Sequence, residues 1–480
     1  MTVEDTFPAV EVMDGKPQKL SLKREVGLVG AVSLVAGTMI GSGIFMSPQF
    51  VLVNIGSPGG SLVIWAACGL LAVLGSLCYA ELGTVIRESG GEYIYILRTS
   101  GPVLAFILIF SSVIFVRPAS VAGISLSFAE YALAPFYQDC PCPQLVVKCV
   151  AAAGIVVTAT VNCLNVRFAM SMQVFFMVAK VLALSVIIIG GVVLLIRGET
   201  ESFEDSFKGT NLGINPIGIA FYQGLWSYDG WNNLNYVTEE LKRPEVNLPR
   251  AVMIAIPMVT MLYLLVNVSY LAAMTPRELM LSSAVAVTWG NKVLGSWGWV
   301  MSIAAALSAF GSLNGTFFSG SRVCFVAARE GHMPDILAMA HVNRLTPSPA
   351  LIFTTAISLL VLIPGDFQSI VNFFSFTAWF FYTITLSGLL YLKIKKPELP
   401  RTYSVPIVIP ILVIMAAIFL VLAPIIDKPA IEYLYVTLFI FSGVLVYVPF
   451  IHYKLCPGLL EKVTVFLQLF LEVAPTDKNL

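Results

Sequence analysis

Long apolar runs recur along almost the whole chain and constrain its fold more than any other feature. Hydrophobic residues make up 58% of the 480 residues, and charged residues only 12%. A soluble protein usually contains about 25% charged residues, and an aqueous globule of this size could not bury so large an apolar excess. Because a helical span takes roughly 20 apolar residues, the sequence predicts an all-α membrane protein.

The runs predict twelve transmembrane helices. They cover residues 26–46, 61–82, 103–131, 145–163, 170–196, 214–238, 249–273, 297–325, 349–364, 368–392, 405–425 and 432–453. Residues 275–296 are too polar to span, and we expect an external loop there with a short helix. The tail at 458–475 is apolar but short and carries charges, which predicts a helix lying on the inner membrane surface.

The distribution of basic residues predicts the orientation. With the N-terminus inside, 20 of the 28 lysines and arginines fall in cytoplasmic segments, six lie outside or at an external boundary, and Arg117 and Lys180 fall within spans. Such a bias agrees with the positive-inside rule. Both termini, 1–25 and 454–480, are therefore expected in the cytoplasm.

Several classes of function are disfavoured. The net charge is zero and no basic stripe carries interleaved aromatic residues, which argues against a nucleic-acid partner. No phosphate-binding loop of the G-x-x-x-x-G-K-[ST] type occurs. The three histidines have no metal-ligand spacing, and no Ser/His pair is visible within the spans. We expect no metal, no cofactor and no catalytic residues.

Two predicted spans are interrupted near their middle. The first contains Gly41-Ser42-Gly43, and glycine costs about 1 kcal/mol relative to alanine within a helix. Close packing through small residues is the alternative explanation for this triplet. The sixth contains Asp229 and Gly230 among amides. An intramembrane carboxylate suggests a functional site, although a structural ion pair with Arg117 or Lys180 would also explain it.

Breaks in spans one and six, five spans apart, are typical of a transporter built from two inverted repeats with its site at the membrane midplane. The repeats would cover 26–196 and 214–392, followed by two extra helices at 405–453. Half-helix N-termini attract a carboxylate and half-helix C-termini attract an ammonium group, so an amino acid zwitterion fits both. The candidate substrate-binding residues are Thr38, Met39, Ile40, Gly41, Ser42, Gly43, Tyr222, Trp226, Ser227, Asp229 and Asn232.

Several motifs, in order, resemble the light chains of heteromeric amino acid transporters. They are Gly37-Thr-Met-Ile-Gly-Ser-Gly-Ile-Phe45, Tyr79-Ala-Glu-Leu-Gly83, Ser89-Gly-Gly-Glu-Tyr93, Asn235-Tyr-Val-Thr-Glu-Glu240 and Arg329-Glu-Gly-His-Met-Pro334. The resemblance runs from about residue 20 to the end. It implies the amino acid/polyamine/organocation superfamily, a LeuT-like fold of five plus five helices with two more, and a multi-pass plasma-membrane protein.

Within this family, the segment from Gly224 to Asn232 is most similar to the b0,+-type subgroup. That resemblance implies a sodium-independent exchanger that imports cationic amino acids (arginine, lysine, ornithine) and cystine in exchange for neutral ones such as leucine, in the apical membrane of epithelia. Asp229 would provide the counter-charge for a cationic side chain, and Trp226 a ring face. Ser227 and Met39 depart from the subgroup's pattern, so a neutral or aromatic-preferring exchanger remains an alternative, as does a non-transporting sensor.

Two basic residues fall within spans. Lys180 lies about eleven residues into its span, roughly 16 Å deep. The resemblance implies that its ammonium takes the place of the sodium ion of sodium-coupled relatives, and a structural pair with a carboxylate is the alternative. For Arg117 we expect snorkelling toward the surface or a structural ion pair rather than substrate contact.

Two of the eight cysteines, Cys140 and Cys142, are predicted to face the outside, where disulfides form. A bridge between them across a single proline would be strained, so a partner chain is plausible. The resemblance implies a disulfide to a single-span glycoprotein heavy chain (rBAT-like). By its spacing from Pro135-Phe-Tyr137, Cys140 matches the family's cysteine, with Cys142 as the alternative. Membrane lipid is the other expected partner.

Overall fold

The computed structural model describes residues 22–137, 140, 142–282, 284–364, 367–426 and 429–476. Nearly all of the ordered structure is helical. The helices in the first half are α1 (Leu28–Met39), α2 (Gly43–Ile55), α3 (Pro58–Val85), α4 (Glu92–Ser100), α5 (Pro102–Ser111), α6 (Arg117–Leu133), α7 (Gln144–Leu164), α8 (Val166–Ile196) and α9 (Ile214–Ser227). Those in the second half are α10 (Pro244–Ala273), α11 (Pro276–Leu281), α12 (Val285–Val293), α13 (Trp299–Arg329), α14 (Ser348–Leu362), α15 (Phe367–Lys395), α16 (Val408–Ile426), α17 (Ile431–Tyr447) and α18 (Pro457–Leu471).

Most of the predicted spans correspond to one long helix each. Within the described ranges, nine helical segments are long and apolar enough to cross a membrane, and the bent pair α1–α2 makes a tenth. The two other predicted spans contain α14, which is apolar but shorter, and α9, which is followed by irregular chain. The molecule is therefore an all-helical protein with many membrane spans.

The first and sixth spans differ in extent from the prediction. The first was expected to end at residue 46, but after its break the chain resumes as α2 and continues to Ile55, where Gly56 ends the helix with a φ of +82°. The sixth was expected at 214–238. Its regular part, α9, ends at Ser227, and the chain then runs through turns into a 3₁₀ segment, Asn233–Glu240.

Short elements connect the spans. The predicted external loop at 275–296 contains α11 and α12. The tail at 458–475 does contain a helix, α18, none of whose residues is buried. Its last residues instead form strand β2 (Val473–Pro475), which pairs antiparallel with β1 (Met339–His341). Neither this pair nor α4 was predicted, because three-residue strands and a mixed-polarity nine-residue helix have no clear periodic pattern.

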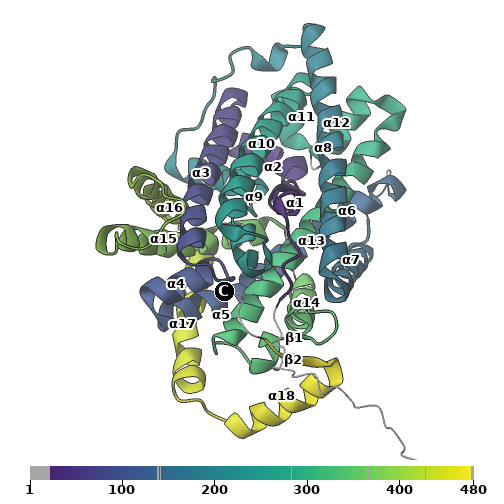
Figure 1. Cartoon of the computed structure of the whole chain (residues 1–480). Helices are drawn as coiled ribbons and strands as arrows, with labels where there is room; N and C mark the ends of the chain where they lie inside the picture. Colours follow the sequence, from purple (N-terminus) through teal and green to yellow (C-terminus); the bar gives the residue numbers. More distant parts are fainter. Residues whose placement is uncertain are drawn as a thin grey trace, which may run out of the picture.

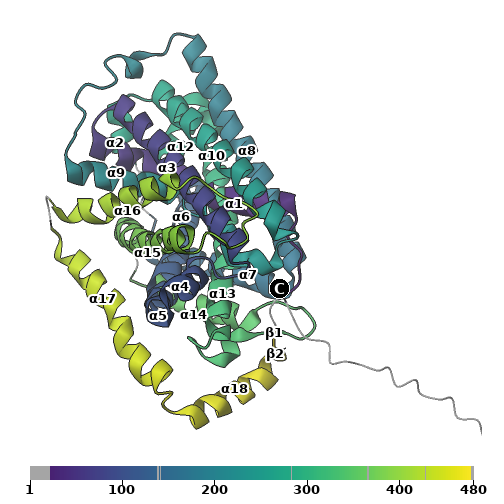
Figure 2. The same cartoon turned by 60° about the vertical axis from the view of Figure 1, so that its left-hand side comes forward.

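The interrupted spans lie in the middle of the helical bundle. Helix α1 packs against α8, α10 and α13, and α2 packs against α9, so the chain on either side of each break is surrounded by other spans. In Figures 1 and 2, α17 and α18 (yellow) lie at the edge of the molecule, whereas Figure 1 shows α1 and α9 in its middle. This arrangement brings the two breaks to one place.

Candidate functional site

The break in the first span is a bend of 42° between α1 and α2. Helix α1 ends at Met39, and Ile40 has a non-helical ψ of 89°. Helix α2 then begins at Gly43, and no side chain caps its N-terminus. Because the first N–H groups of a helix have no partner within it, they are available here to an anionic group.

The carbonyl groups at the end of α1 are hydrogen-bonded by side chains of α13. The Ser312 hydroxyl donates to the Thr38 carbonyl at 2.8 Å, and the Ser308 hydroxyl donates to the Ile40 carbonyl at 3.2 Å. These bonds replace those that a continuous helix would have made. The broken conformation is therefore stabilised by neighbouring spans.

The break in the sixth span follows Ser227. Gly230 has a φ of +105°, which a residue with a Cβ rarely adopts. The hydroxyl of Tyr263, on α10, lies 2.6 Å from the Ser227 carbonyl and 2.5 Å from the Met39 carbonyl. One buried hydroxyl thus connects the two breaks directly.

The two broken spans also touch each other. A Cβ on Gly43 would lie 2.6 Å from Ser227 Oγ and 2.7 Å from Ser227 Cα, closer than real atoms approach. Glycine at this position is therefore required by the close approach of the first and sixth spans. Both explanations for the glycine triplet therefore apply. The helix is broken at this point, and the small residues also allow the two spans to pack closely.

A small cavity lies between the breaks, and most of its wall was predicted. Its lining combines residues of the first span, the sixth span, α6 and α13. The predicted residues that line it are Thr38, Met39, Gly41, Ser42, Gly43, Trp226 and Asp229, and the additional ones are Ile124 and Ser312.

Four predicted site residues do not line this cavity. Tyr222 is buried and donates to the Leu420 carbonyl of α16 at 2.5 Å, so its side chain faces away from the breaks. Ile40 and Ser227 are buried beside the cavity, and Asn232 belongs to a separate polar cluster. These four differ from the other seven because adjacent residues of a helix or turn point in different directions.

The additional lining residues had a partial signal in the sequence. The span at 297–325 contains Ser308, Ser312 and Asn314 on its buried side, and polar groups inside a membrane segment are unusual. Ser312 could have been found in that way. Ile124 has no such signal, because an isoleucine in an apolar span looks like any other.

Asp229 lies in the cavity wall without a basic partner at ion-pair distance among the described residues. The two candidate partners are engaged elsewhere. A guanidinium nitrogen of Arg117 lies 3.7 Å from a carboxylate oxygen of Glu92, and the Lys180 ammonium donates to a backbone carbonyl. The structural ion pair proposed as an alternative for Asp229 is therefore not formed.

A buried polar cluster joins Arg117 to the chain beyond the sixth-span break. Arg117 donates to the Tyr236 hydroxyl and lies over that ring at 4.6 Å. The Tyr236 hydroxyl donates to Glu92 at 2.6 Å, and the Asn232 amide lies within 3.4 Å of Glu92 and 3.3 Å of Tyr382. Because Arg117 is buried, the snorkelling alternative was wrong and the structural pair was right. The partners could not be predicted, since they come from three segments that are distant in the sequence: α4, the chain at 232–236 and α15.

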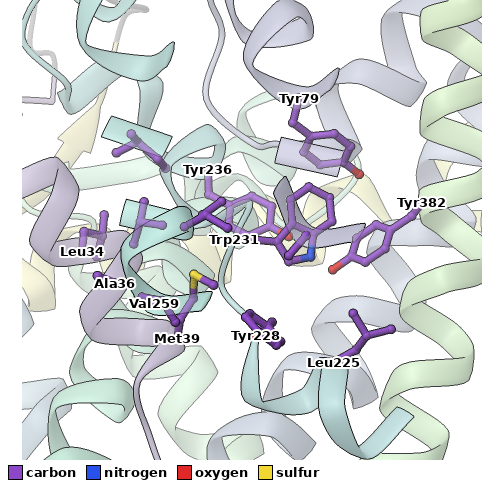
Figure 3. Close-up of a cluster of buried hydrophobic side chains, with 14 of the residues drawn as sticks. Leu34, Ala36, Met39, Tyr79, Leu225, Tyr228, Trp231, Tyr236, Val259 and Tyr382 are labelled. Carbon is purple, nitrogen blue, oxygen red and sulfur yellow. The ribbon is translucent and has the colours of Figure 1, made fainter. Parts of the chain in front are cut away.

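Aromatic rings surround the same region. Figure 3 shows Trp231 between Tyr79 and Tyr382, with ring centroids 4.8 and 5.1 Å apart, and Met39 of α1 on the other side of the group. Tilted and edge-on ring contacts of this kind stabilise buried aromatic groups by about 0.5–1.5 kcal/mol per pair. The irregular chain after Asp229 is therefore held in a rigid environment.

Lys180 lies where α8, α1 and α13 meet. Its side chain is buried, and its ammonium donates to the Gly37 carbonyl in the last turn of α1. A Cβ on Gly311 of α13 would lie 2.9 Å from Nζ, so the glycine leaves room for the ammonium. No carboxylate of the described residues lies within ion-pair distance of Lys180, so the alternative of a structural pair is not formed.

The two cysteines predicted to face outside are accessible. Cys140 is exposed and Cys142 is half-buried, and neither forms a disulfide within the chain. They lie between α6 and α7, in a segment whose neighbouring residues 138, 139 and 141 are outside the described ranges. A thiol of this loop is therefore available to another chain.

Residues 26–450 match the amino acid permease family. The chain is 49% identical to human b(0,+)-type amino acid transporter 1 over 470 residues, covering 98% of this chain and 96% of the relative. It is 42% identical to the human cystine/glutamate transporter (96% and 93% covered) and to mouse large neutral amino acids transporter small subunit 2 (89% and 81%). These relatives are transporters and not enzymes, and the chain belongs to the amino acid permease family.

Proposed function

We propose that this protein is a sodium-independent amino acid exchanger of the plasma membrane. In this proposal it imports cationic amino acids and cystine in exchange for neutral amino acids. The observation that carries the proposal is the meeting of two broken spans around one cavity with Asp229 in its wall. An enclosed site between broken helices at mid-span is the arrangement by which secondary transporters bind small charged substrates.

The chemistry of the cavity suits an α-amino acid. The uncapped N-terminus of α2 provides N–H groups and a positive dipole end for the carboxylate. The carbonyls at the end of α1 keep a second lone pair, which can accept from the ammonium group. Asp229 and the ring of Trp226 also line the cavity and can contact the substrate side chain. A carboxylate and an aromatic face both favour a cationic side chain.

The substrate range is supported by the relatives. One of them is a b(0,+)-type amino acid transporter, and another carries cystine and glutamate according to its name. We infer the cationic and cystine range for this chain because its cavity has a carboxylate, which would repel an anionic side chain in a low-dielectric site.

The architecture that we infer is a LeuT-like arrangement of twelve spans. Two inverted repeats would cover 26–196 and 214–392, with the two further helices at 405–453 outside them and both termini in the cytoplasm. The breaks at 40–42 and 228–232 would then occupy corresponding places in the two repeats. The described spans are consistent with this arrangement.

Sodium independence is inferred from Lys180. Its ammonium brings a fixed positive charge to the end of α1, between that helix, α8 and α13. A cation that is part of the protein does not have to enter and leave with each transport cycle. No bound sodium ion would then be needed to bridge these three helices.

The proposed partner is a single-span glycoprotein heavy chain, linked through Cys140. The exposure of this thiol and the absence of a disulfide within the chain support the assignment. The chain would then be the light subunit of a heterodimer.

Flux in proteoliposomes tests the proposal. Vesicles preloaded with leucine receive radiolabelled arginine, cystine or leucine outside, in sodium or in choline buffer. We expect arginine and cystine uptake that requires internal amino acid and is unchanged in choline. Binding without flux would indicate a sensor, preference for leucine over arginine and cystine would indicate the neutral-preferring exchanger, and uptake that collapses in choline would contradict the proposed coupling.

A further inference from the structure

A basic pocket of about 350 Å³ lies where α7 ends and α8 begins. Three separate parts of the chain form it: the segment before α1, the α7–α8 turn and the segment before α14. Its polar lining consists of Lys23, Glu25, Asn165, Arg167, Asn343 and Arg344. Three basic groups against one carboxylate give the pocket a formal net charge of +2.

The carboxylate of this pocket orients the basic groups and leaves their outer faces free. Glu25 lies 2.7 Å from Lys23 and 3.1 Å from Arg167. The Glu25 side chain is only 7% exposed, whereas those of Lys23 and Arg167 are 58% and 74% exposed. Arg344 uses one nitrogen for the Leu164 carbonyl at 3.2 Å and is otherwise exposed. Arginine forks of this kind bind phosphate groups well.

An apolar groove of about 390 Å³ adjoins the basic pocket. It runs between α7 and α14, which pack side by side (Figure 1), and its wall includes Val156, Ala159, Ile352, Ala356 and Leu359. Leu164 lines both the groove and the basic pocket, so the two are continuous. The groove lies along α7, one of the helices able to cross a membrane.

We propose that this double cavity binds an anionic phospholipid, with its phosphorylated headgroup in the basic pocket and an acyl chain in the α7–α14 groove. The proposal goes beyond the transport function and does not depend on the substrate. Charge complementarity selects an anionic headgroup over a zwitterionic one. The end of α7 lies on the side that the basic residues predict to be cytoplasmic, where anionic lipids are concentrated.

Native mass spectrometry of the full-length chain in detergent tests this site. The probes are dioleoyl phosphatidylinositol 4-phosphate, dioleoyl phosphatidylcholine and the soluble headgroup glycerophosphoinositol 4-phosphate. We expect the phosphoinositide to bind more tightly than phosphatidylcholine. The double variant Arg167→Gln/Arg344→Gln should weaken phosphoinositide binding about thirty-fold, since each basic group contributes about fivefold, and leave phosphatidylcholine unaffected.

Two further variants separate the alternatives. Lys242→Gln/Arg250→Gln removes two exposed basic groups outside the pocket and should leave binding within about twofold of the unmodified chain. Ala356→Trp fills the groove and should weaken lipid binding on the order of tenfold without affecting the free headgroup.

Equal losses in the two charge variants would overturn the proposal. So would a free headgroup that binds as tightly as the lipid, which would indicate a site for soluble phosphate. Unchanged lipid binding in Ala356→Trp would also overturn it, and would leave the groove to a partner's transmembrane helix.

Discussion

Buried charged side chains have different roles at the residue scale. Arg322 and Glu240 are both fully buried and form a two-pronged pair at 2.7 and 3.0 Å, so their charges are satisfied within the protein. Asp229 instead lines a cavity. An unpaired charge inside a membrane is costly. A cationic substrate in the cavity would therefore stabilise the Asp229 carboxylate by providing its counter-charge.

The first prediction concerns Asp229. Asp229→Asn keeps the size of the side chain but removes its charge, so arginine and lysine transport should fall at least tenfold, and leucine transport by less than about twofold. Uptake of the three substrates in proteoliposomes measures this, with Asp205→Asn in the exposed loop before α9 as the control. An equal loss for every substrate would show that Asp229 has a structural role instead.

The second prediction concerns Lys180. Lys180→Ala removes the donor to the Gly37 carbonyl, and a buried group without a partner costs roughly 1–3 kcal/mol. Exchange should fall about tenfold or more, because 1.4 kcal/mol shifts a conformational equilibrium by that factor. Surface expression is measured beside flux, with Lys208→Ala as the control at an exposed site. Normal flux at normal expression would contradict the role given to this ammonium.

At the scale of elements, the two interrupted spans depend on each other and on α10 and α13. The carbonyls at the end of α1 are capped by serines of α13, and Tyr263 of α10 connects both breaks. A half-helix that relies on other helices for its hydrogen bonds can rearrange only together with them. Changes at the contact between the two broken spans should therefore affect transport more than stability.

The third prediction concerns this contact. Gly43→Ala places a methyl group against Ser227, and overpacking of this kind costs about 1–3 kcal/mol. We expect a loss of exchange of about tenfold or more for all substrates, with the protein still in the membrane. Gly27→Ala is the matched control, because nothing lies within 4 Å of a Cβ there. Similar effects of the two variants on flux would argue against a contact that matters for transport.

At the scale of the whole molecule, distant parts of the chain are tied together around the bundle. Strand β2, near the end of the described chain, pairs with β1 between α13 and α14. The Glu81 carboxylate of α3 contacts Lys393 in the last turn of α15 at 2.9 Å and Arg401 at 3.2 Å, which connects the end of α15 and the chain that follows it to α3. Cys140, between α6 and α7, is exposed, which suits the proposed attachment of a second subunit.

The fourth prediction concerns that attachment. Cys140→Ser should abolish a reducible heterodimer band on non-reducing gels when the chain is expressed with the proposed heavy chain, whereas Cys142→Ser should retain most of it. The reason is that Cys140 is the more exposed of the two thiols. Loss of the band only in Cys142→Ser would reverse the assignment. A band that survives the double change Cys140→Ser/Cys142→Ser would exclude a covalent link through this loop.

The helical membrane architecture and the two interruptions that border the cavity could be predicted from the sequence. Apolar runs of span length can be buried only in lipid or against other spans, which is a local property of each segment. The breaks were also visible, because Gly41, Gly43, Asp229 and Gly230 are residues that a continuous span would avoid. The cavity between the breaks contains seven of the eleven predicted substrate-binding residues.

The tertiary structure alone decided which side chains share the site. Tyr222 turned out to face α16, while Ser312 and Ile124 entered the cavity wall from other helices. The partners of Arg117, and the carbonyl that accepts from Lys180, likewise come from distant segments. Local sequence determines whether a segment can span the membrane and where its helix is interrupted, because both properties depend on the polarity and backbone freedom of that segment. The direction of each side chain depends on how the helices are rotated and packed against one another, and only the folded bundle determines that.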